Sequence, residues 1–505
     1  MMHLLLAQAS ARPLPPIATP PVEYSAMLPE LLLIGGAVVL LLTASVVRRR
    51  PPWLWTGITL ATGAATMAAS LGLWFDVRHN GPREIVANAL VVDGFAVFFM
   101  VLVSVTVILG ALLATAYLDR EGFPGPEFYI LLLLSASGAV VMASANDLIV
   151  LFLGLEILSI ALYVLAGFHP RRPESKEAAM KYFVLGAFSS ALFLYGVALV
   201  YGSTGTTNLQ SIRLFLASNV ATNGGVLFAG AALLLVGLGF KVAVVPFHTW
   251  TPDVYQGSPS PATGFMAAAA KAAGFAGLLR IFFSTFSTLR FDWRPIVFVL
   301  AVVTLLVGSV LAVVQTNIKR MLAYSSISHA GYVLIGLQAA TAAGIAGSLF
   351  YLLAYTFMVL GSFAVITAVG QPGDSHHELS DYKGLASRRP AMAFAFTILL
   401  LSQAGVPFTT GFLAKFYVIS AAVQSRSYAL ALVGMLSAVI AAFFYLRVTV
   451  LMYTPLPAGD EAPPRRLAVP AATGLVLAVA ATFTVAFGLV PSPMIHFARQ
   501  ATLLL

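Results

Sequence analysis

The sequence contains no cysteine, and only 9% of its 505 residues are charged. The absence of cysteine excludes disulfides, iron–sulfur ligation, thiolate catalysis and zinc–thiolate sites in this chain. The shortage of charge is equally informative, because a soluble domain ordinarily carries about 25% charged residues. With 59% hydrophobic residues and a mean hydropathy of +0.92, the composition indicates a chain that folds in a membrane.

Motifs for nucleotide, metal and nucleic-acid binding are also missing. The sequence has no Walker loop, no H-E-x-x-H motif and no glycine-rich fingerprint between a strand and a helix. Its net charge of +9 comes from lysines and arginines scattered among short loops, without a basic face or interleaved aromatics. We therefore expect no nucleic-acid partner, and we interpret the loop charges as signals of membrane topology.

Long apolar runs, each about as long as a bilayer crossing of roughly 20 residues, predict an all-α membrane protein. We expect about fourteen transmembrane helices, at 28–46, 52–75, 93–117, 127–145, 147–168, 177–201, 226–256, 261–283, 295–314, 320–340, 344–368, 391–425, 427–452 and 467–492. Residues 1–27 are predicted to be an extramembrane lead, because their apolar run is short and lacks the basic start of a signal peptide.

Two of the predicted spans, 226–256 and 391–425, are too long for one straight crossing, and each has a proline near its middle. Proline removes a backbone hydrogen bond and clashes with the preceding turn, so we expect helix breaks at Pro246 and Pro407. Broken backbone in a membrane is tolerated only where it is buried in protein or lines a wet cavity. The two breaks also have similar local sequences, VPFHT and VPFTT.

The two broken spans are five spans apart, so they run in opposite directions through the membrane. This arrangement predicts two inverted five-helix repeats, at 126–290 and 291–455. Other transmembrane helices precede the repeats, in 28–125, and one follows them, in 456–505. A pair of unrelated proline kinks is the alternative explanation.

Loop charges predict the orientation of the chain, because lysine and arginine are enriched in loops on the inner side of a membrane. If the N-terminus lies outside, the inner segments hold fourteen basic residues and the outer segments hold eight. We therefore expect both termini to face outward.

Six basic residues lie within the predicted spans, whereas Glu156 is the only acid placed deep in one. A charge at a helix centre in a membrane costs roughly 2.5–3.5 kcal/mol, so such residues are by default functional and need a partner. One acid cannot neutralise the three deep lysines Lys241, Lys271 and Lys415. An unpaired buried amine lowers its cost by releasing its proton, and neighbouring amines can then exchange protons as their charges change.

This excess of buried amines predicts a relay for protons or another small cation, bridged by water. Its predicted members are Glu156, Lys181, Lys241, Lys271 and Lys415, with His248 and His329 in support. Static ion pairs are the alternative for the deep lysines, and ordinary packing is the alternative for the histidines. Lys181 is only about 6 Å from the end of its helix, so an interfacial anchor is the alternative there.

Several stretches between residues 90 and 455 form a recognisable set. They are 154–159, 178–186, 240–257, Lys271, 324–332 and 407–415. In these stretches the chain resembles the antiporter-like membrane subunits of respiratory complex I, most specifically around Lys241. At position 415 the chain has a lysine, as subunit N does, whereas subunit M usually has glutamate there. In this respect the chain resembles subunit N. The chain also lacks the long lateral helix of subunit L.

The resemblance implies a fourteen-helix proton-channel module in a bacterial inner membrane. It carries the relay roles over to Glu156, Lys181, Lys241, Lys271 and Lys415. The implied partners are the lipid bilayer and other membrane subunits, including neighbouring antiporter-like subunits. The chain would be a non-redox subunit of a translocase and would bind no cofactor or metal itself, whereas NADH, FMN, iron–sulfur clusters and quinone would be used elsewhere in the complex.

Two other functions stay open at this point. A subunit of a multisubunit Na⁺/H⁺ antiporter would share the fold and the buried lysines, although the run 250–255 favours complex I. A purely structural membrane scaffold is the third reading, and the unpaired central lysines argue against it.

Overall fold

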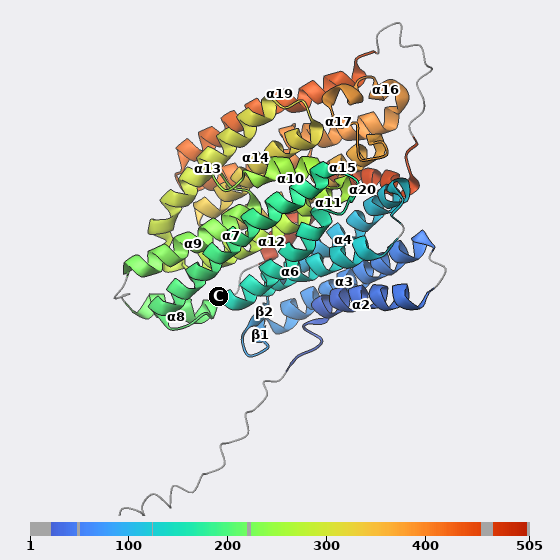
Figure 1. Cartoon of the computed structure of the whole chain (residues 1–505). Helices are drawn as coiled ribbons and strands as arrows, with labels where there is room; N and C mark the ends of the chain where they lie inside the picture. The colour runs from blue at the N-terminus through green and yellow to red at the C-terminus, as the bar shows by residue number, and fades with distance from the viewer. Residues whose placement is uncertain (1–21, 48–50, 124, 220–223, 456–467, 502–505) are drawn as a thin grey trace, which may run out of the picture.

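The computed structural model describes residues 22–47, 51–123, 125–219, 224–455 and 468–501, and most of them are helical. Figure 1 shows long helices lying side by side, with a β-hairpin and helix α8 toward one end of the bundle and α16 toward the other. We call these the hairpin end and the α16 end. Among the described residues, twelve helices are long and apolar enough to cross a membrane.

The described chain begins with three long helices and a short hairpin. These elements are α2 (Leu28–Val46), α3 (Pro52–Asn80), the antiparallel strands β1 (Arg83–Ile85) and β2 (Leu90–Val92), and α4 (Gly94–Glu121). The strand register pairs Arg83 with Val92. Asp93 then starts α4, because its carboxylate accepts the Ala96 N–H at 2.7 Å as an N-cap does.

The next group of helices ends in one long buried helix. It comprises α5 (Glu127–Ser144), α6 (Leu148–Ala166), α7 (Pro173–Thr204), α8 (Leu209–Ser218), α9 (Gly224–Val242), α10 (Trp250–Gly257), α11 (Ser260–Phe265), η1 (Met266–Ala270), α12 (Lys271–Leu278) and η2 (Leu279–Thr285). The last four form one continuous helix in which η1 and η2 are π-helical. π segments are frequent at functional sites, and Lys271 directly follows the first one.

The remaining helices surround a second buried helix. They are η3 (Ser287–Leu289), α13 (Arg290–Val313), α14 (Ile318–Ala339), α15 (Ala342–Val369), η4 (Leu379–Tyr382), α16 (Leu385–Arg388), α17 (Pro390–Ala404), α18 (Thr410–Gln424), α19 (Tyr428–Tyr453), α20 (Ala471–Leu489) and α21 (Ser492–Gln500). The apolar windows of α15 and of the 260–285 helix are fully buried, whereas α2 and α20 bury only 28% of theirs. The core therefore lies around these two helices, and the outer helices present apolar side chains toward lipid or partners.

Each of the fourteen predicted spans coincides with a helix or with a broken pair of helices. Two of them are not among the twelve apolar helices. α14 carries Lys319, Arg320 and His329, and α17 and α18 have only 15 residues each. The all-α membrane fold is confirmed, while the count of fourteen and the inverted repeats stay predictions. The hairpin and α8 were not predicted, because both are too short to give an apolar run.

The first predicted helix break separates α9 from α10 at residues 243–249 and contains Pro246. It begins before the proline, at Ala243, whose φ of +63° lies outside the helical region. The Val245 N–H donates to Thr304 Oγ1 of α13 at 3.1 Å. A neighbouring helix thus satisfies a backbone group that the break releases.

The second predicted break separates α17 from α18 at residues 405–409. Gly405 has a φ of +95°, which a residue with a side chain would disfavour, and Pro407 follows two residues later. Thr409 starts α18, because its hydroxyl accepts the Phe412 N–H at 3.4 Å. Both breaks therefore contain the predicted proline, but each one starts earlier, at a residue with positive φ.

A substitution at Thr304 tests whether its hydroxyl stabilises the first break. Thr304→Val keeps the shape of the side chain but leaves the buried Val245 N–H without its acceptor, which costs about 1–3 kcal/mol. We expect a lower unfolding temperature of the purified chain in detergent. Thr356→Val is the matched control, because the buried Thr356 hydroxyl bonds only to Leu352 O of its own helix. Equal unfolding temperatures for the two variants would contradict the prediction.

Candidate functional site

Three lysines lie in the interior of the bundle. Lys241 is in the last turn of α9, Lys271 starts α12 and Lys415 is in α18. Their exposed fractions are 5%, 3% and 5%. Within the described residues, none of the three has a carboxylate within 4.0 Å, since the ion pairs there involve other residues. The excess of buried amines inferred from the sequence is therefore present in the structure.

Neutral oxygen atoms surround Lys241. Its Nζ donates to Ser159 Oγ of α6 at 2.8 Å and to Tyr182 OH of α7 at 3.1 Å. Gly274 of α12 lets α9 approach closely at this point, because a Cβ there would lie 2.6 Å from Cγ1 of Val242. Helix packing thus fixes the amine between two hydroxyl groups.

Glu156 is half-buried on α6, one turn before Ser159. Its carboxylate accepts a hydrogen bond from Ser190 of α7. The carboxylate and the Lys241 amine are not in direct contact, but Ser159 lies on the same helix as Glu156 and accepts a hydrogen bond from Lys241. The predicted acid and the first deep lysine are therefore neighbours joined by one hydroxyl group.

Lys271 contacts the backbone of α14. Its Nζ donates to Ser326 O at 2.6 Å and lies 5.9 Å from the ring centroid of Tyr355. Tyr255 of α10 approaches the same serine, with its hydroxyl 3.4 Å from Ser326 Oγ. Lys271 is therefore anchored by a carbonyl group and an aromatic face.

His329 lies between the second and third lysines and is hydrogen-bonded through both ring nitrogens. Nδ1 is 2.6 Å from Tyr351 OH, and Nε2 is 3.1 Å from Tyr445 OH. Tyr445 OH is also bonded to Ser325, one residue before the serine that holds Lys271. A histidine that only packs would have one satisfied ring nitrogen, whereas both ring nitrogens of His329 have hydrogen-bond partners.

Lys415 lies at the C-terminal end of the preceding helix. Its Nζ donates to Gln403 O at 2.9 Å and to Ala404 O at 2.8 Å, two of the last carbonyls of α17. Tyr332 covers the amine, with its ring centroid 4.9 Å away. The end of a helix carries partial negative charge on such carbonyls, so the second break supplies the partners of this lysine.

Aromatic and polar contacts connect these groups into one row. Tyr182 stacks on Trp250 at 4.5 Å between ring centroids, and Trp250 meets Tyr255 at 6.5 Å. On the other side, Tyr351 stacks on Tyr332 at 5.8 Å. The row therefore runs from Lys241 through Lys271 and His329 to Lys415.

Lys181 lies apart from this row. Its side chain is 41% exposed and forms ion pairs with Glu177 at 2.7 Å and with Asp253 at 2.6 Å. Asp253 also binds Arg320 at 2.6 Å. The structure thus gives Lys181 two carboxylate partners. Glu177 lies four residues earlier on the same helix, a spacing that favours an ion pair, whereas Asp253 comes from α10 and no spacing in the sequence indicates it.

The other predicted supporting residues lie within the breaks. Pro246 and Pro407 are exposed in the isolated chain, and His248 is half-buried. Nδ1 of His248 has no hydrogen-bond partner among the described residues. His248 therefore lies in the first break, and among the described residues no hydrogen bond joins its side chain to the lysine row.

Arg280 is a buried cation whose partner was not predicted from the sequence. It forms a two-pronged ion pair with Asp93 at 2.9 and 3.0 Å, and both side chains are fully buried. It also donates to Ala143 O at 2.8 Å. The two residues are 187 positions apart, so no local pattern could reveal the pair.

A second buried ion cluster lies near the α16 end, around Asp374. Lys319 is 3.1 Å, Arg172 3.0 Å and His377 3.0 Å from its carboxylate oxygens. Burial alone would raise the pKa of Asp374, but these basic neighbours hold it well below its ordinary value. Lys319 and Arg172 lie outside the predicted spans, where basic residues are expected to be loop charges. The structure places both in this cluster instead.

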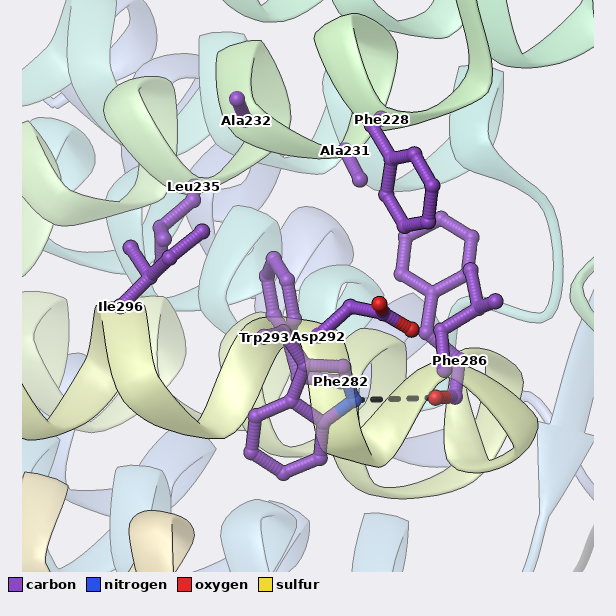
Figure 2. Close-up of a pocket in the computed structure, with 10 residues that line it drawn as sticks. Phe228, Ala231, Ala232, Leu235, Phe282, Phe286, Asp292, Trp293 and Ile296 are labelled. Atoms are coloured by element: carbon purple, nitrogen blue, oxygen red, sulfur yellow. Dashed lines mark hydrogen bonds between the residues drawn. The ribbon is translucent and has the colours of Figure 1, made fainter. Parts of the chain in front are cut away.

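The cavity in Figure 2 is separate from the lysine row. It has a volume of about 60 Å³ and lies between α9 and the segment 282–296. Phe228, Phe282 and Trp293 are among its walls, and the Trp293 indole donates to Phe286 O at 2.9 Å. The described residues contain no group of three or more His, Asp or Glu side chains that could hold a metal ion.

Residues 145–441 match the family model described as NADH:quinone oxidoreductase/Mrp antiporter, transmembrane part. The matched stretch contains all five predicted relay residues. The chain belongs to this family.

Relatives and solved structures agree with this membership. The chain is 45% identical over 419 residues to the NADH-quinone oxidoreductase subunit N of Trichlorobacter lovleyi, covering 83% of this chain and 85% of the relative. It is 46% identical over 392 residues to the subunit of that name from Mycobacterium tuberculosis, covering 77% and 73%. A chain of respiratory complex I from Thermus thermophilus matches with a TM-score of 0.77 and 33% identity, over 93% of this chain and 98% of that one.

Within this family, the antiporter relatives share the fold. A chain of the Mrp complex from Dietzia matches with a TM-score of 0.83 over 95% of this chain and 97% of that one, at 21% identity. The two relatives at 45% and 46% identity are both named subunit N. The predicted resemblance to the antiporter-like membrane subunits is confirmed, and the chain is a multi-pass membrane protein.

Proposed function

We propose that this chain translocates protons across a bacterial inner membrane as the subunit N of an NADH:quinone oxidoreductase. The observation that carries the proposal is the row of three buried lysines without carboxylate partners. The subunit N relatives at 45% and 46% identity support the choice of complex.

The proposed relay consists of the predicted residues. They are Glu156, Lys181, Lys241, Lys271 and Lys415. Hydroxyl and carbonyl oxygens stabilise an ammonium at each deep lysine, but no carboxylate fixes its charge, so the proton can leave. A proton that arrives at one amine raises the cost of charge on the next, and protons therefore advance as neighbours change state.

The two halves of the relay differ in how their members are connected. His329 and its tyrosines provide hydrogen-bonding groups between Lys271 and Lys415. Between Lys241 and Lys271 the connection passes the rings of Trp250 and Tyr255, so this step needs water. The break at Pro246, with His248 beside it, lies next to this step and is our candidate for the water path.

We place Lys181 at the entrance of the relay, because it is exposed and lies toward the α16 end. Asp253 and Glu177 favour its charged form and hold it away from Glu156. Release from these carboxylates would let it pass a proton inward.

The chain would work as one part of a larger machine. NADH, FMN, iron–sulfur clusters and quinone would be used by other subunits, with no redox site here. Its apolar outer faces would contact lipid and neighbouring membrane subunits, including antiporter-like ones. Conformational or electrostatic signals from the redox subunits would then drive the relay.

We also propose the inverted repeats and the outward termini. Each group of five spans has its broken helix in fourth place, namely α9–α10 after α5, α6 and α7, and α17–α18 after α13, α14 and α15. In this orientation the α16 end faces the cytoplasm.

The proposed complex predicts which proteins co-purify with this chain. An affinity-tagged copy, solubilised in mild detergent from its native membrane, should co-purify with NADH dehydrogenase activity and with bound flavin. Isolation together with antiporter subunits, and without flavin, would instead identify a member of a multisubunit Na⁺/H⁺ antiporter.

The relay predicts that Lys241→Ala lowers coupled proton pumping by about tenfold or more, because general acid–base groups contribute at least that much. Assembly of the complex should be unchanged, as judged by its size in native gels. Lys176→Ala is the control, since Lys176 is exposed in the first turn of α7. Normal pumping by Lys241→Ala would favour a structural scaffold.

The orientation can be tested directly because the chain has no cysteine. Ser218→Cys, at the end of α8, should react with a membrane-impermeant maleimide in intact cells, and Ser375→Cys should not. Both positions are exposed. Inverted vesicles should give the opposite result, and labelling of Ser375→Cys in intact cells would reverse the proposed topology.

A further inference from the structure

A large cavity opens near the α16 end and belongs to none of the features above. Its volume is about 670 Å³, and α4, α15, α16 and the start of α20 contribute to its walls. Arg120 is one residue before the end of α4, Gly370 directly follows α15, and Thr473 is in the first turn of α20. Since three membrane helices begin or end around it, the cavity lies at the depth of lipid headgroups.

The lining of this cavity is basic. Arg120 and Arg388 both contribute to it, and the described residues that line it include no carboxylate. Arg388 has no ion pair within the described residues. Arg120 is partly neutralised by Glu121 at 2.9 Å, but Glu121 is also engaged by His169 at 3.2 Å. The cavity therefore presents a net positive charge.

Backbone carbonyls hold both guanidinium groups in place. Arg120 Nη1 donates to Thr367 O at 2.7 Å and to Gly370 O at 2.6 Å. Arg388 Nη2 donates to Asp381 O at 2.7 Å and to Lys383 O at 3.2 Å. A fixed guanidinium loses little freedom when it binds an anion, and its planar fork suits phosphate oxygens.

The deeper side of the cavity is lined by small side chains, two alanines and Thr367, whose hydroxyl donates to Phe363 O of its own helix. Ala116 lies one turn below Arg120 on α4, and Ala368 lies opposite on α15. A free anion would gain nothing from these walls, whereas the glycerol and acyl part of a phospholipid would pack against them. A smaller cavity of about 210 Å³ shares Arg388, but Asp381 lines it, so we confine the site to the larger one.

We propose that this cavity binds the headgroup of an anionic phospholipid, with Arg388 contacting its phosphate and Arg120, whose donors are already used or buried, adding positive charge beside it. Basic pockets between transmembrane helices bind anionic headgroups in this way. The proposal needs only that the chain spans a membrane, so it can fail without affecting the proton relay.

The experiment measures retained lipid on the full-length purified chain. The protein is reconstituted with equal amounts of phosphatidylglycerol and phosphatidylcholine, re-extracted in mild detergent and analysed by native mass spectrometry. We expect the wild type to retain phosphatidylglycerol in preference to phosphatidylcholine. Arg388→Gln should lower that preference about fivefold, and Arg120→Gln with Arg388→Gln should lower it further.

Arg447→Gln is the matched control. Arg447 is also held by backbone carbonyls, Val313 O at 2.8 Å and Gln315 O at 2.5 Å, but it does not line the cavity. Within the described residues, the Arg388 guanidinium is hydrogen-bonded only to the carbonyls of Asp381 in the short helix η4 and of Lys383. Its single variant therefore tests the site even if loss of Arg120 impairs folding. Equal retention by Arg388→Gln, Arg447→Gln and the wild type would overturn the proposal.

A further arm separates lipid from a soluble anion. Inorganic phosphate is added during re-extraction at increasing concentration, with chloride at the same ionic strength as its control. Phosphatidylglycerol that resists phosphate as well as it resists chloride supports a lipid site. Displacement by phosphate alone would assign the cavity to a soluble phosphate and overturn the lipid assignment.

Discussion

The structure depends on how three ammonium groups are held in a protein interior without carboxylates. Such a group needs several oxygen acceptors, and in a membrane protein most carbonyls are already used inside helices. Lys415 takes its acceptors from the last carbonyls of α17, which are available because the helix stops at Gly405. Lys241 lies in the last turn before the other break, and Lys271 follows a π segment. Each buried amine therefore lies beside irregular backbone, and at Lys415 that backbone also supplies the acceptors.

Paired and unpaired charges are kept in different parts of the fold. Arg280 and Asp93 form a fully buried pair, and Asp374 collects three basic partners near the α16 end. Removing one partner of such a pair leaves an uncompensated charge and costs several kcal/mol, so these groups hold the helices together. The unpaired lysines lie elsewhere, along one row. A group that must change its charge cannot also be the one that fixes the fold.

The sequence predicted the elements that depend on local chemistry. Apolar runs located the spans, and the two prolines located both breaks, because each effect acts within one helix. The count of amines against acids predicted that one acid could not neutralise all three deep lysines, and within the described residues none of the three has a carboxylate partner. The start of each break was not predicted, since the positive φ angles of Ala243 and Gly405 are set by how the chain must turn, not by proline alone.

Partners that come from distant segments could not be predicted. Nothing in the sequence links Asp93 to Arg280, or Lys319 to Asp374. Lys319 was expected in a loop, but its ion pair with Asp374 is buried. The same limit applies to Lys181. Asp253 and Arg320 come close to Lys181 because α10 packs against α7 and α14, and this packing cannot be predicted from local sequence. Because α10 carries Asp253 and directly follows the first break, any movement of that short helix would change the partners of Lys181 and the surroundings of Lys241 together. The break thus links the exposed end of the proposed relay to its interior.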